Sequence, residues 1–298
     1  MRPRAEVAGD TVVYTFGNGL VVTAEVAGKD DPLRILPLGP VQEAVLHYLA
    51  TSPGCARGKG VFEPFAGSGA FGLMALLVGA SAVDLLDVNP RARAFQLRSA
   101  RLNRFGPERL RCLTGDLATF VPDRRYDLLL ANPPFVPTPD GIEGTLSSNG
   151  GPDGNRFAGL LLHRLDELLQ PDGEAVLCLF QLVRDGVPLI ADTLGTGLPG
   201  RSVEFSPLQA CPVPFESYCA AYERQHPAAL PAIRRWRAAL SRGHSDQLGL
   251  AHHLMHIRPA TSARGELLVR DRPAERFGGD FVIAAGHEDS APVDGRRR

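Results

Sequence analysis

The sequence lacks the features that mark secreted, zinc-binding or membrane proteins. It has five cysteines, an odd number, and none of them forms a Cys-x-x-Cys pair, which argues against both a disulfide framework and a zinc ribbon. No stretch approaches the roughly 20 apolar residues that a membrane-spanning helix needs. The N-terminal residues also show no apolar run typical of a signal peptide. We therefore expect a reduced, cytoplasmic protein.

An excess of charge of either sign is also missing. The formal net charge is −1 at pH 7, so the whole chain has no general attraction to nucleic acid or to membranes. This disfavours a nucleic-acid substrate without excluding it, because a local basic face can serve the same purpose. His252 and His256 share one face of a predicted strand but would lie roughly 13 Å apart, too far for one ion. We predict no metal site.

From residue 60 onward, short apolar runs alternate with stretches of helical spacing, which is typical of a parallel α/β sheet. The periodicity places helices near residues 70–79, 90–104 and 156–169. We predict an α/β fold with a doubly wound, mostly parallel, seven-stranded sheet. Its strands are predicted at 61–62, 83–86, 110–113, 126–130, 175–180, 203–205 and 248–257.

The chain divides into three predicted parts. Residues 1–40 form an N-terminal β extension, because residues 11–25 resemble a hairpin around a Gly-Asn-Gly turn. Residues 41–260 form the main α/β domain and contain an insertion at about 209–247. Residues 261–298 form a C-terminal extension with a disordered tail.

The first motif that carries chemistry is EPFAGSGAFG, which begins at Glu63, follows a predicted strand and opens a predicted helix. Glycines at such a junction allow a tight turn and the close approach of a ligand. Asp87 follows Gly67 by 20 residues, at the end of the next strand, where a carboxylate can accept both hydroxyl protons of a ribose. The same spacing of Gly67, Gly69 and Gly72 also fits a dinucleotide site. A nicotinamide-dependent oxidoreductase and a turn without a ligand therefore remain alternatives at this point.

The second motif is Asn132-Pro133-Pro134-Phe135, which directly follows the strand at 126–130. Two prolines fix the turn, so the Asn132 side chain is held beyond the carboxyl end of the strand. The Asn132 amide oxygen and the Pro133 carbonyl can accept the two protons of an NH2 group, and Phe135 offers a face for stacking. Such a cage positions a nitrogen for reaction, and a dehydrogenase has no need of it.

Together with LLDVNPRA, these motifs resemble the three main signatures of class I S-adenosylmethionine (SAM) dependent methyltransferases, over roughly residues 58–182. The Asn-Pro-Pro-Phe form is similar to the branch that methylates glutamine or adenine nitrogens. The loop Asn149–Gly154, which reads NGGPDG, further resembles the glutamine methyltransferases that modify translation release factors. The resemblance implies an enzyme that transfers a methyl group from SAM to a planar amide or amino nitrogen, without a metal.

The resemblance also implies roles for individual residues. Glu63 would lie near the amino group of SAM, and Asp87 would hold its ribose hydroxyls. Val88 would pack on the adenine, and Asp116 would bind the adenine amino group. Asn132 and Phe135 would face both methyl donor and acceptor. The full set implied to contact the cofactor is Glu63, Phe65, Ala66, Gly67, Ser68, Gly69, Asp87, Val88, Asp116, Leu117 and Asn132.

The acceptor stays open at this stage. The NGGPDG loop favours a protein glutamine, whereas Asn-Pro-Pro-Phe and the arginines around Trp236 favour a nucleic-acid base. The near-neutral charge favours a small metabolite, and an O- or N-methyltransferase of a natural product is an alternative. The arginine-rich segment 230–242 also fits an amphipathic helix with a solvated basic face. The aromatic segment 212–219, which contains Phe215 and Tyr218, is a candidate cap over the acceptor. The sequence does not predict the oligomeric state.

Overall fold

The computed structural model describes residues 3–26, 31–195, 197–242 and 248–283. The N-terminal part is a three-stranded antiparallel sheet of β1 (Arg4–Ala8), β2 (Thr11–Thr15) and β3 (Val21–Glu25). The predicted hairpin is confirmed as β2 and β3, and the tight turn between them closes with Phe16 N–H donating to the Leu20 carbonyl (2.9 Å). Strand β1 was not predicted.

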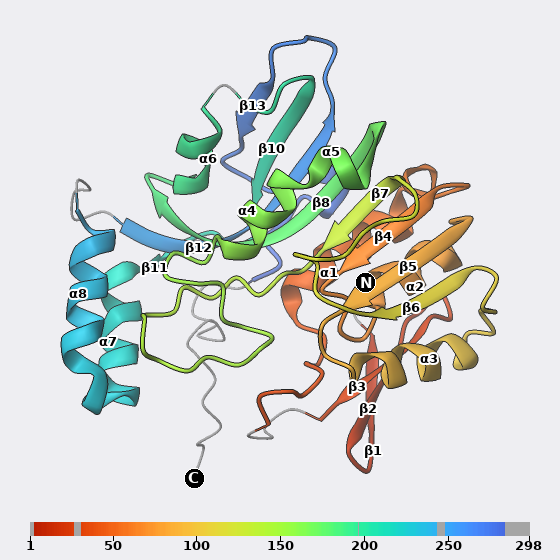
Figure 1. Cartoon of the computed structure of the whole chain (residues 1–298), viewed down its shortest axis with the longest axis horizontal. Helices are drawn as coiled ribbons and strands as arrows, with labels where there is room; N and C mark the ends of the chain where they lie inside the picture. Colours follow the sequence, from red (N-terminus) through yellow and green to blue (C-terminus); the bar gives the residue numbers. More distant parts are fainter. Residues whose placement is uncertain (1–2, 27–30, 196, 243–247, 284–298) are drawn as a thin grey trace.

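The main sheet has the strand order β13-β10-β12-β8-β7-β4-β5-β6, and the short strands β9 and β11 pair with β8 and β12 (Figure 1). The pairs β5–β6, β4–β5, β4–β7 and β7–β8 are parallel, and β8–β12 and β10–β12 are antiparallel. The strands are β4 (Gly60–Pro64), β5 (Ala82–Asp87), β6 (Leu110–Thr114), β7 (Tyr126–Ala131), β8 (Leu169–Arg184), β9 (Val187–Pro188), β10 (Arg201–Pro207), β11 (Val213–Pro214), β12 (Leu248–Pro259) and β13 (Glu266–Val269).

Helices cover both faces of this sheet. One face packs against α1, α2 and α3, whose buried residues join those of the N-terminal sheet in one core. The other face packs against α4, α5 and α6. The helices are α1 (Pro40–Thr51), α2 (Ala70–Leu77), α3 (Ala92–Leu102), α4 (Arg156–His163), α5 (Leu165–Leu168), α6 (Leu189–Leu194), α7 (Phe215–Gln225) and α8 (Leu230–Leu240), with single turns η1 (Pro53–Cys55), η2 (Pro227–Ala229) and η3 (Glu275–Phe277).

The predicted doubly wound, mostly parallel fold is confirmed, with two differences. The predicted helix at 156–169 is divided into α4 and α5, and β8 begins at Leu169. In the described part of the chain the main sheet has ten strands rather than seven. The additional ones are β9, β11 and β13, which are two to four residues long and carry too little apolar alternation to stand out in the sequence.

The residues beyond 260 contribute to this sheet as well. β13 pairs in parallel with β10 through Ser202↔Glu266 to Phe205↔Val269, and Phe277 of η3 is buried against Tyr48 of α1 (ring centroids 5.3 Å apart). The predicted disordered tail falls on residues 284–298, which lie outside the described residues. The three-part division of the chain stays a prediction.

The order of the strands also indicates where a ligand would bind. The chain runs outward from β4 through β5 to β6, then returns to the other side of β4 with β7 and β8. In open α/β sheets, such a reversal opens a crevice at the carboxyl ends of the strands, where ligands bind. The ends of β4, β5 and β7 carry the motifs that the sequence singled out.

Candidate active site

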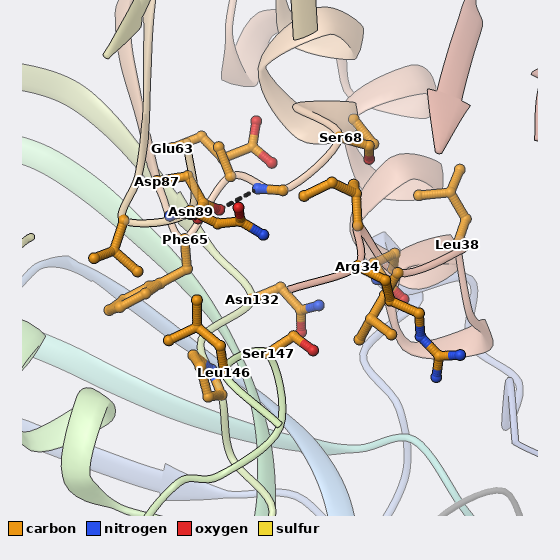
Figure 2. Close-up of a pocket in the computed structure, with 18 of the residues that line it drawn as sticks. Arg34, Leu38, Glu63, Phe65, Ser68, Asp87, Asn89, Asn132, Leu146 and Ser147 are labelled. Carbon is orange, nitrogen blue, oxygen red and sulfur yellow. Dashed lines mark hydrogen bonds between the residues drawn. The ribbon is translucent and has the colours of Figure 1, made fainter. Parts of the chain in front are cut away.

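A cleft lies at the carboxyl ends of β4, β5 and β7, with a free volume of about 780 Å³ that is partly open to solvent. Three parts of the chain line it: the β4–α2 turn with the end of β5, the segment 32–42, and the region 132–147 (Figure 2). The lining residues are Pro32, Arg34, Ile35, Leu36, Leu38, Gln42, Glu63, Phe65, Ala66, Gly67, Ser68, Ala70, Phe71, Asp87, Val88, Asn89, Asn132, Pro134, Leu146 and Ser147.

The β4–α2 turn presents backbone to the cleft. Gly67 has a φ of +49°, and a Cβ atom added there would meet no atom within 4 Å, so a ligand can approach its main chain closely. Gly69 has a φ of +76°, and a Cβ atom there would lie 2.6 Å from Cδ1 of Leu85. The lack of a side chain at Gly67 therefore leaves room for a ligand in the cleft, whereas the lack of one at Gly69 lets the turn pack against β5.

Glu63 is a buried carboxyl beneath this turn. It is the penultimate residue of β4 and accepts hydrogen bonds from Gly72 N–H (2.7 Å) and Phe71 N–H (3.4 Å) in the first turn of α2. Burial raises the pKa of Glu63 to about 8, against the opposing effect of these two bonds. Because a nearby cation favours the ionised form of a carboxyl, Glu63 is suited to face the ammonium group of a ligand.

Asp87 ends β5 and ties that end of the strand to the β4–α2 turn. Its carboxylate accepts hydrogen bonds from Gly67 N–H (2.6 Å) and Asn89 N–H (2.8 Å) (Figure 2). Burial raises the pKa of Asp87, and the two backbone bonds oppose that shift. A carboxylate has about four acceptor positions, so positions remain for the hydroxyl groups of a ligand.

Asn132 is the first residue after β7, and its side chain lies in the cleft (Figure 2). Its Oδ1 atom is buried and has no hydrogen-bond partner among the described residues. A buried polar atom without a partner costs about 1–3 kcal/mol, so its retention at a cleft indicates that a ligand supplies the missing donor.

One wall of the cleft comes from the N-terminal segment 31–38, which carries no motif that predicts a place in the site. Asn89 Nδ2–H donates to the Leu33 carbonyl (2.5 Å), and Ile35 N–H donates to Glu25 Oε2 (3.0 Å). Arg91 forms ion pairs with Glu25 and Asp31. These contacts bring the segment over the end of β5. No local sequence pattern predicts them, because the partners lie 10 to 66 residues apart.

The opposite wall is the loop of residues 136–155, which we call the cleft loop. It contributes Leu146 and Ser147 to the lining. A Cβ atom added at Gly150 or Gly154 would lie 2.8 Å or 2.5 Å from backbone atoms of Phe135. The glycines of the NGGPDG segment are therefore required for the loop to pack directly on Asn-Pro-Pro-Phe, which brings these two predicted motifs together.

Several predicted site residues do not line the cleft. Gly69 faces β5, as described above. Asp116 is exposed and accepts a hydrogen bond from Ala118 N–H (2.9 Å), whereas Leu117 is buried and its carbonyl accepts from Arg164. Pro133 is buried beneath the turn. The lining comprises Glu63, Phe65, Ala66, Gly67, Ser68, Asp87, Val88, Asn132 and Pro134 from the predicted set.

Phe135 differs most from the sequence-based expectation. Its ring packs edge-on against His252 (centroids 5.6 Å apart) and tilted against Phe180 (6.4 Å), and it is absent from the lining of the cleft. The ring belongs to the apolar layer between the sheet and α7. In this structure Phe135 anchors the turn rather than presenting a stacking face to the cleft.

No group of three or more histidine, cysteine, aspartate or glutamate side chains is arranged to hold a metal ion within the described ranges. No helix in the described part of the chain is long and apolar enough to cross a membrane.

Comparisons with known proteins give short sequence matches. The chain is 38% identical over 77 residues to the ribosomal protein L11 methyltransferase of Methylococcus capsulatus, covering 26% of each chain. It is 34% identical over 93 residues to that of Dichelobacter nodosus, covering 31% of this chain and 30% of the relative. The chain thus spans about a quarter to a third of the length of these curated relatives. No family model matches it.

The fold has a closer counterpart. The crystal structure of a SAM-dependent methyltransferase from Agrobacterium tumefaciens superposes with a TM-score of 0.51 at 14% sequence identity, over 86% of this chain and 72% of the other. The fold is that of the class I SAM-dependent methyltransferases. The reversal of strand order at β4, the glycine turn and the acidic end of β5 occupy the edge of this fold at which the cleft opens.

Proposed function

We propose that this protein is a SAM-dependent methyltransferase that methylates a planar amide or amino nitrogen. The observation that carries the proposal is the buried Oδ1 atom of Asn132, which has no hydrogen-bond partner among the described residues and lies in the same cleft as Glu63, Gly67 and Asp87. The sequence matches to methyltransferases support the reaction class.

The cleft fits SAM through groups that the structure brings together. The open backbone at Gly67 would lie against the methionine part, and Glu63 would face its ammonium group. The free acceptor positions of Asp87 would take the ribose hydroxyls. Val88, which is 46% exposed at the cleft, would cover the adenine. When bound, SAM supplies an electrophilic methyl group on a sulfonium.

Asn132 would orient the acceptor. Its Oδ1 atom would accept an N–H of the acceptor, which satisfies a buried atom and turns the nitrogen lone pair toward the cofactor side of the cleft. The fixed geometry comes from Pro133 and Pro134, which lock the turn after β7. The packing of Phe135 on Phe180 and His252 holds that turn. The nitrogen would lose its proton to solvent.

Among the three acceptor classes, we place a protein nitrogen first. The relatives that match in sequence are named for the methylation of a ribosomal protein, and the NGGPDG segment packs on the Asn132 turn. A nucleic-acid base is less well supported: Trp236 is 7% exposed and its Nε1–H donates to the Pro152 carbonyl (2.7 Å), so it offers no stacking face.

The test is transfer of a radiolabelled methyl group from SAM into a cell extract that is then separated into protein, nucleic acid and small molecules. We expect label in the protein fraction with the wild-type enzyme. Asn132→Ala should lower that transfer by two to three orders of magnitude, which is the usual cost of losing a positioning hydrogen bond at a reacting centre. Asn18→Ala, an exposed asparagine at the β2–β3 turn, is the matched control and should retain activity.

The outcomes separate the parts of the proposal. Label in another fraction, lost in Asn132→Ala, would keep the chemistry and change the acceptor class. Equal transfer by Asn132→Ala and the wild type would remove Asn132 from the mechanism. Absence of SAM binding by calorimetry would overturn the reaction class itself.

A further inference from the structure

The predicted insertion folds as a helical hairpin of α7 and α8. Four aromatic side chains on these helices pack on one another, with Phe215 and Trp236 at 5.5 Å, Tyr222 and Trp236 at 5.7 Å, and Tyr218 and Tyr222 at 5.4 Å between ring centroids. Tyr218 also contacts Phe180 of β8 (5.9 Å). The predicted amphipathic helix at 230–242 is confirmed as α8, which buries Ile233 and Trp236.

The hairpin is bonded to the cleft loop through three buried donors. Tyr218 O–H and Tyr222 O–H both donate to the Pro137 carbonyl, at 2.9 Å and 3.1 Å. Trp236 Nε1–H donates to the Pro152 carbonyl at 2.7 Å. The carbonyls of Pro137 and Pro152, on the two legs of the loop, are thus held by side chains that lie 81 to 85 residues further along the chain. Figure 1 shows α7 and α8 beside this loop.

These anchors act on a loop with a narrow neck. Val136 N–H donates to the Ser148 carbonyl (2.8 Å), Gly150 N–H to the Val136 carbonyl (3.0 Å) and Thr138 N–H to the Gly151 carbonyl (2.9 Å). Beyond this neck the loop carries Ser147, which lines the cleft. Ile142, near the tip, is buried against the same aromatic group of the hairpin. Neck and tip are therefore both fixed by the hairpin.

We propose that the α7–α8 hairpin is a positioning element of the active site, in which Tyr218, Tyr222 and Trp236 hold the cleft loop against the Asn132 turn. This deepens the proposed function and rests on it. The three side chains do not line the cleft and are at most 7% exposed, so they touch neither cofactor nor acceptor. This replaces the sequence-based expectation that Tyr218 caps the acceptor directly.

The positioning role predicts a separation between cofactor binding and turnover. The cofactor groups Glu63, Gly67 and Asp87 belong to β4, the β4–α2 turn and β5, which the hairpin does not hold. The loop that packs on Phe135 and Asn132 is the part that the hairpin fixes. Loosening the loop should therefore lower turnover and leave the affinity for SAM nearly unchanged.

The test uses the full chain with Tyr218→Phe and Tyr222→Phe combined, which removes both hydroxyl donors and keeps the rings. Hydrogen exchange followed by mass spectrometry, with SAM present, should show the peptide spanning residues 136–151 exchanging about tenfold faster than in the wild type. Methyl transfer into the accepting fraction should fall about tenfold in kcat, and the Kd for SAM should stay within threefold.

Two further variants complete the design. Trp236→Phe keeps an aromatic ring but removes the donor to Pro152, and it should accelerate exchange in the same peptide. Tyr126→Phe is the matched control: it removes a tyrosine hydroxyl that donates to Asp84 (2.7 Å), away from the cleft loop, and should leave exchange in residues 136–151 unchanged.

The measurements distinguish a failure of the positioning role from a failure of the methyltransferase function. Unchanged loop exchange and unchanged kcat in the double variant, with SAM bound, would overturn the positioning role alone. A loss of SAM affinity equal to the loss of kcat would also overturn it, because the hairpin would then support the whole cleft. If the wild type binds no SAM, the proposed function fails whatever the exchange shows.

Discussion

Phe65 stands where β4 leads into the glycine turn, and its backbone φ is +57°, in the left-handed region that favours glycine. The ring lines the cleft and packs edge-on against Phe157 (centroids 5.2 Å apart). A residue other than glycine in this region costs roughly 1–2 kcal/mol. The protein therefore accepts backbone strain at this position to retain an aromatic wall beside the cofactor turn.

This strain predicts an unusual order of stabilities. Phe65→Ala should lose the ring contact and keep the strained backbone, whereas Phe65→Gly should lose the ring and relieve the strain. We expect Phe65→Gly to be more stable than Phe65→Ala by about 1 kcal/mol, although glycine normally destabilises relative to alanine. Urea unfolding of both variants measures the difference. If Phe65→Ala were the more stable, the left-handed backbone would carry no strain.

At the scale of elements, β12 is a strand with three buried histidines, His252, His253 and His256. Burial lowers the pKa of His252 to about 3 and that of His253 to about 4. Burial also lowers the pKa of His256. Its Nε2 atom lies 3.2 Å from Glu174 Oε2, and its Nδ1 atom accepts a hydrogen bond from Arg276 Nε–H (2.9 Å). The HHLMH segment is therefore part of the core of the sheet, held in the neutral form.

The buried histidines predict a loss of stability in acid. Their folded pKa values lie below the unfolded value of 6.5, so the unfolded chain binds more protons as the pH falls below 6.5. Stability is present above pH 6.5 and is lost as the pH falls toward 4. His253→Leu removes one proton-binding site from the unfolded chain. It should reduce the slope of the unfolding free energy between pH 6 and 5 by about 1.2 kcal/mol per pH unit.

Urea unfolding of wild type and His253→Leu at pH 5, 6 and 7 measures this slope. The comparison is one of slopes rather than of absolute stabilities, because leucine also removes the contact between His253 Nδ1 and the Ala251 carbonyl (3.3 Å). An unchanged slope would show that folding does not lower the pKa of His253.

At the scale of the whole molecule, the N-terminal sheet is packed into the main core and supports one wall of the cleft, although its strands do not line the cleft. Its residues share one core with α1, α2 and α3. Thr23 N–H donates to Ser99 Oγ (2.9 Å), which attaches β3 to α3. The chain that leaves β3 then forms the cleft wall at 31–38. Cofactor binding should therefore stabilise the N-terminal sheet together with the main sheet.

This arrangement predicts a global effect of SAM on unfolding. At a free concentration 100 times its Kd, SAM should raise the unfolding free energy by about 2.7 kcal/mol. NADH at the same concentration should leave unfolding unchanged. Denaturant titration with each compound measures both effects, and stabilisation by NADH alone would instead favour the oxidoreductase alternative. Asp87→Ala should weaken the effect of SAM, since it removes the expected partner of the ribose.

The amino-acid sequence alone determined the strands and turns whose conformation depends on residues close together in the chain. Short apolar runs between stretches of helical spacing predicted the parallel strands. Glycine and proline spacing predicted the turns after β4 and β7, because backbone restrictions act over a few residues. The cleft is lined by Glu63 of β4, by Gly67 in the turn that follows, and by Asn132 in the turn after β7. The assignment of a class I methyltransferase fold was available at this level.

Only the tertiary structure decided which distant segments complete the site. The walls at 31–38 and 146–147 depend on contacts such as Asn89 with Leu33 and Tyr218 with Pro137, between residues 56 and 81 positions apart. The orientation of Phe135, away from the cleft and toward Phe180, follows from the pairing of β8 with β12 and the packing of α7. Such contacts arise when elements far apart in the chain pack together. A pattern of neighbouring residues cannot predict which distant elements will meet.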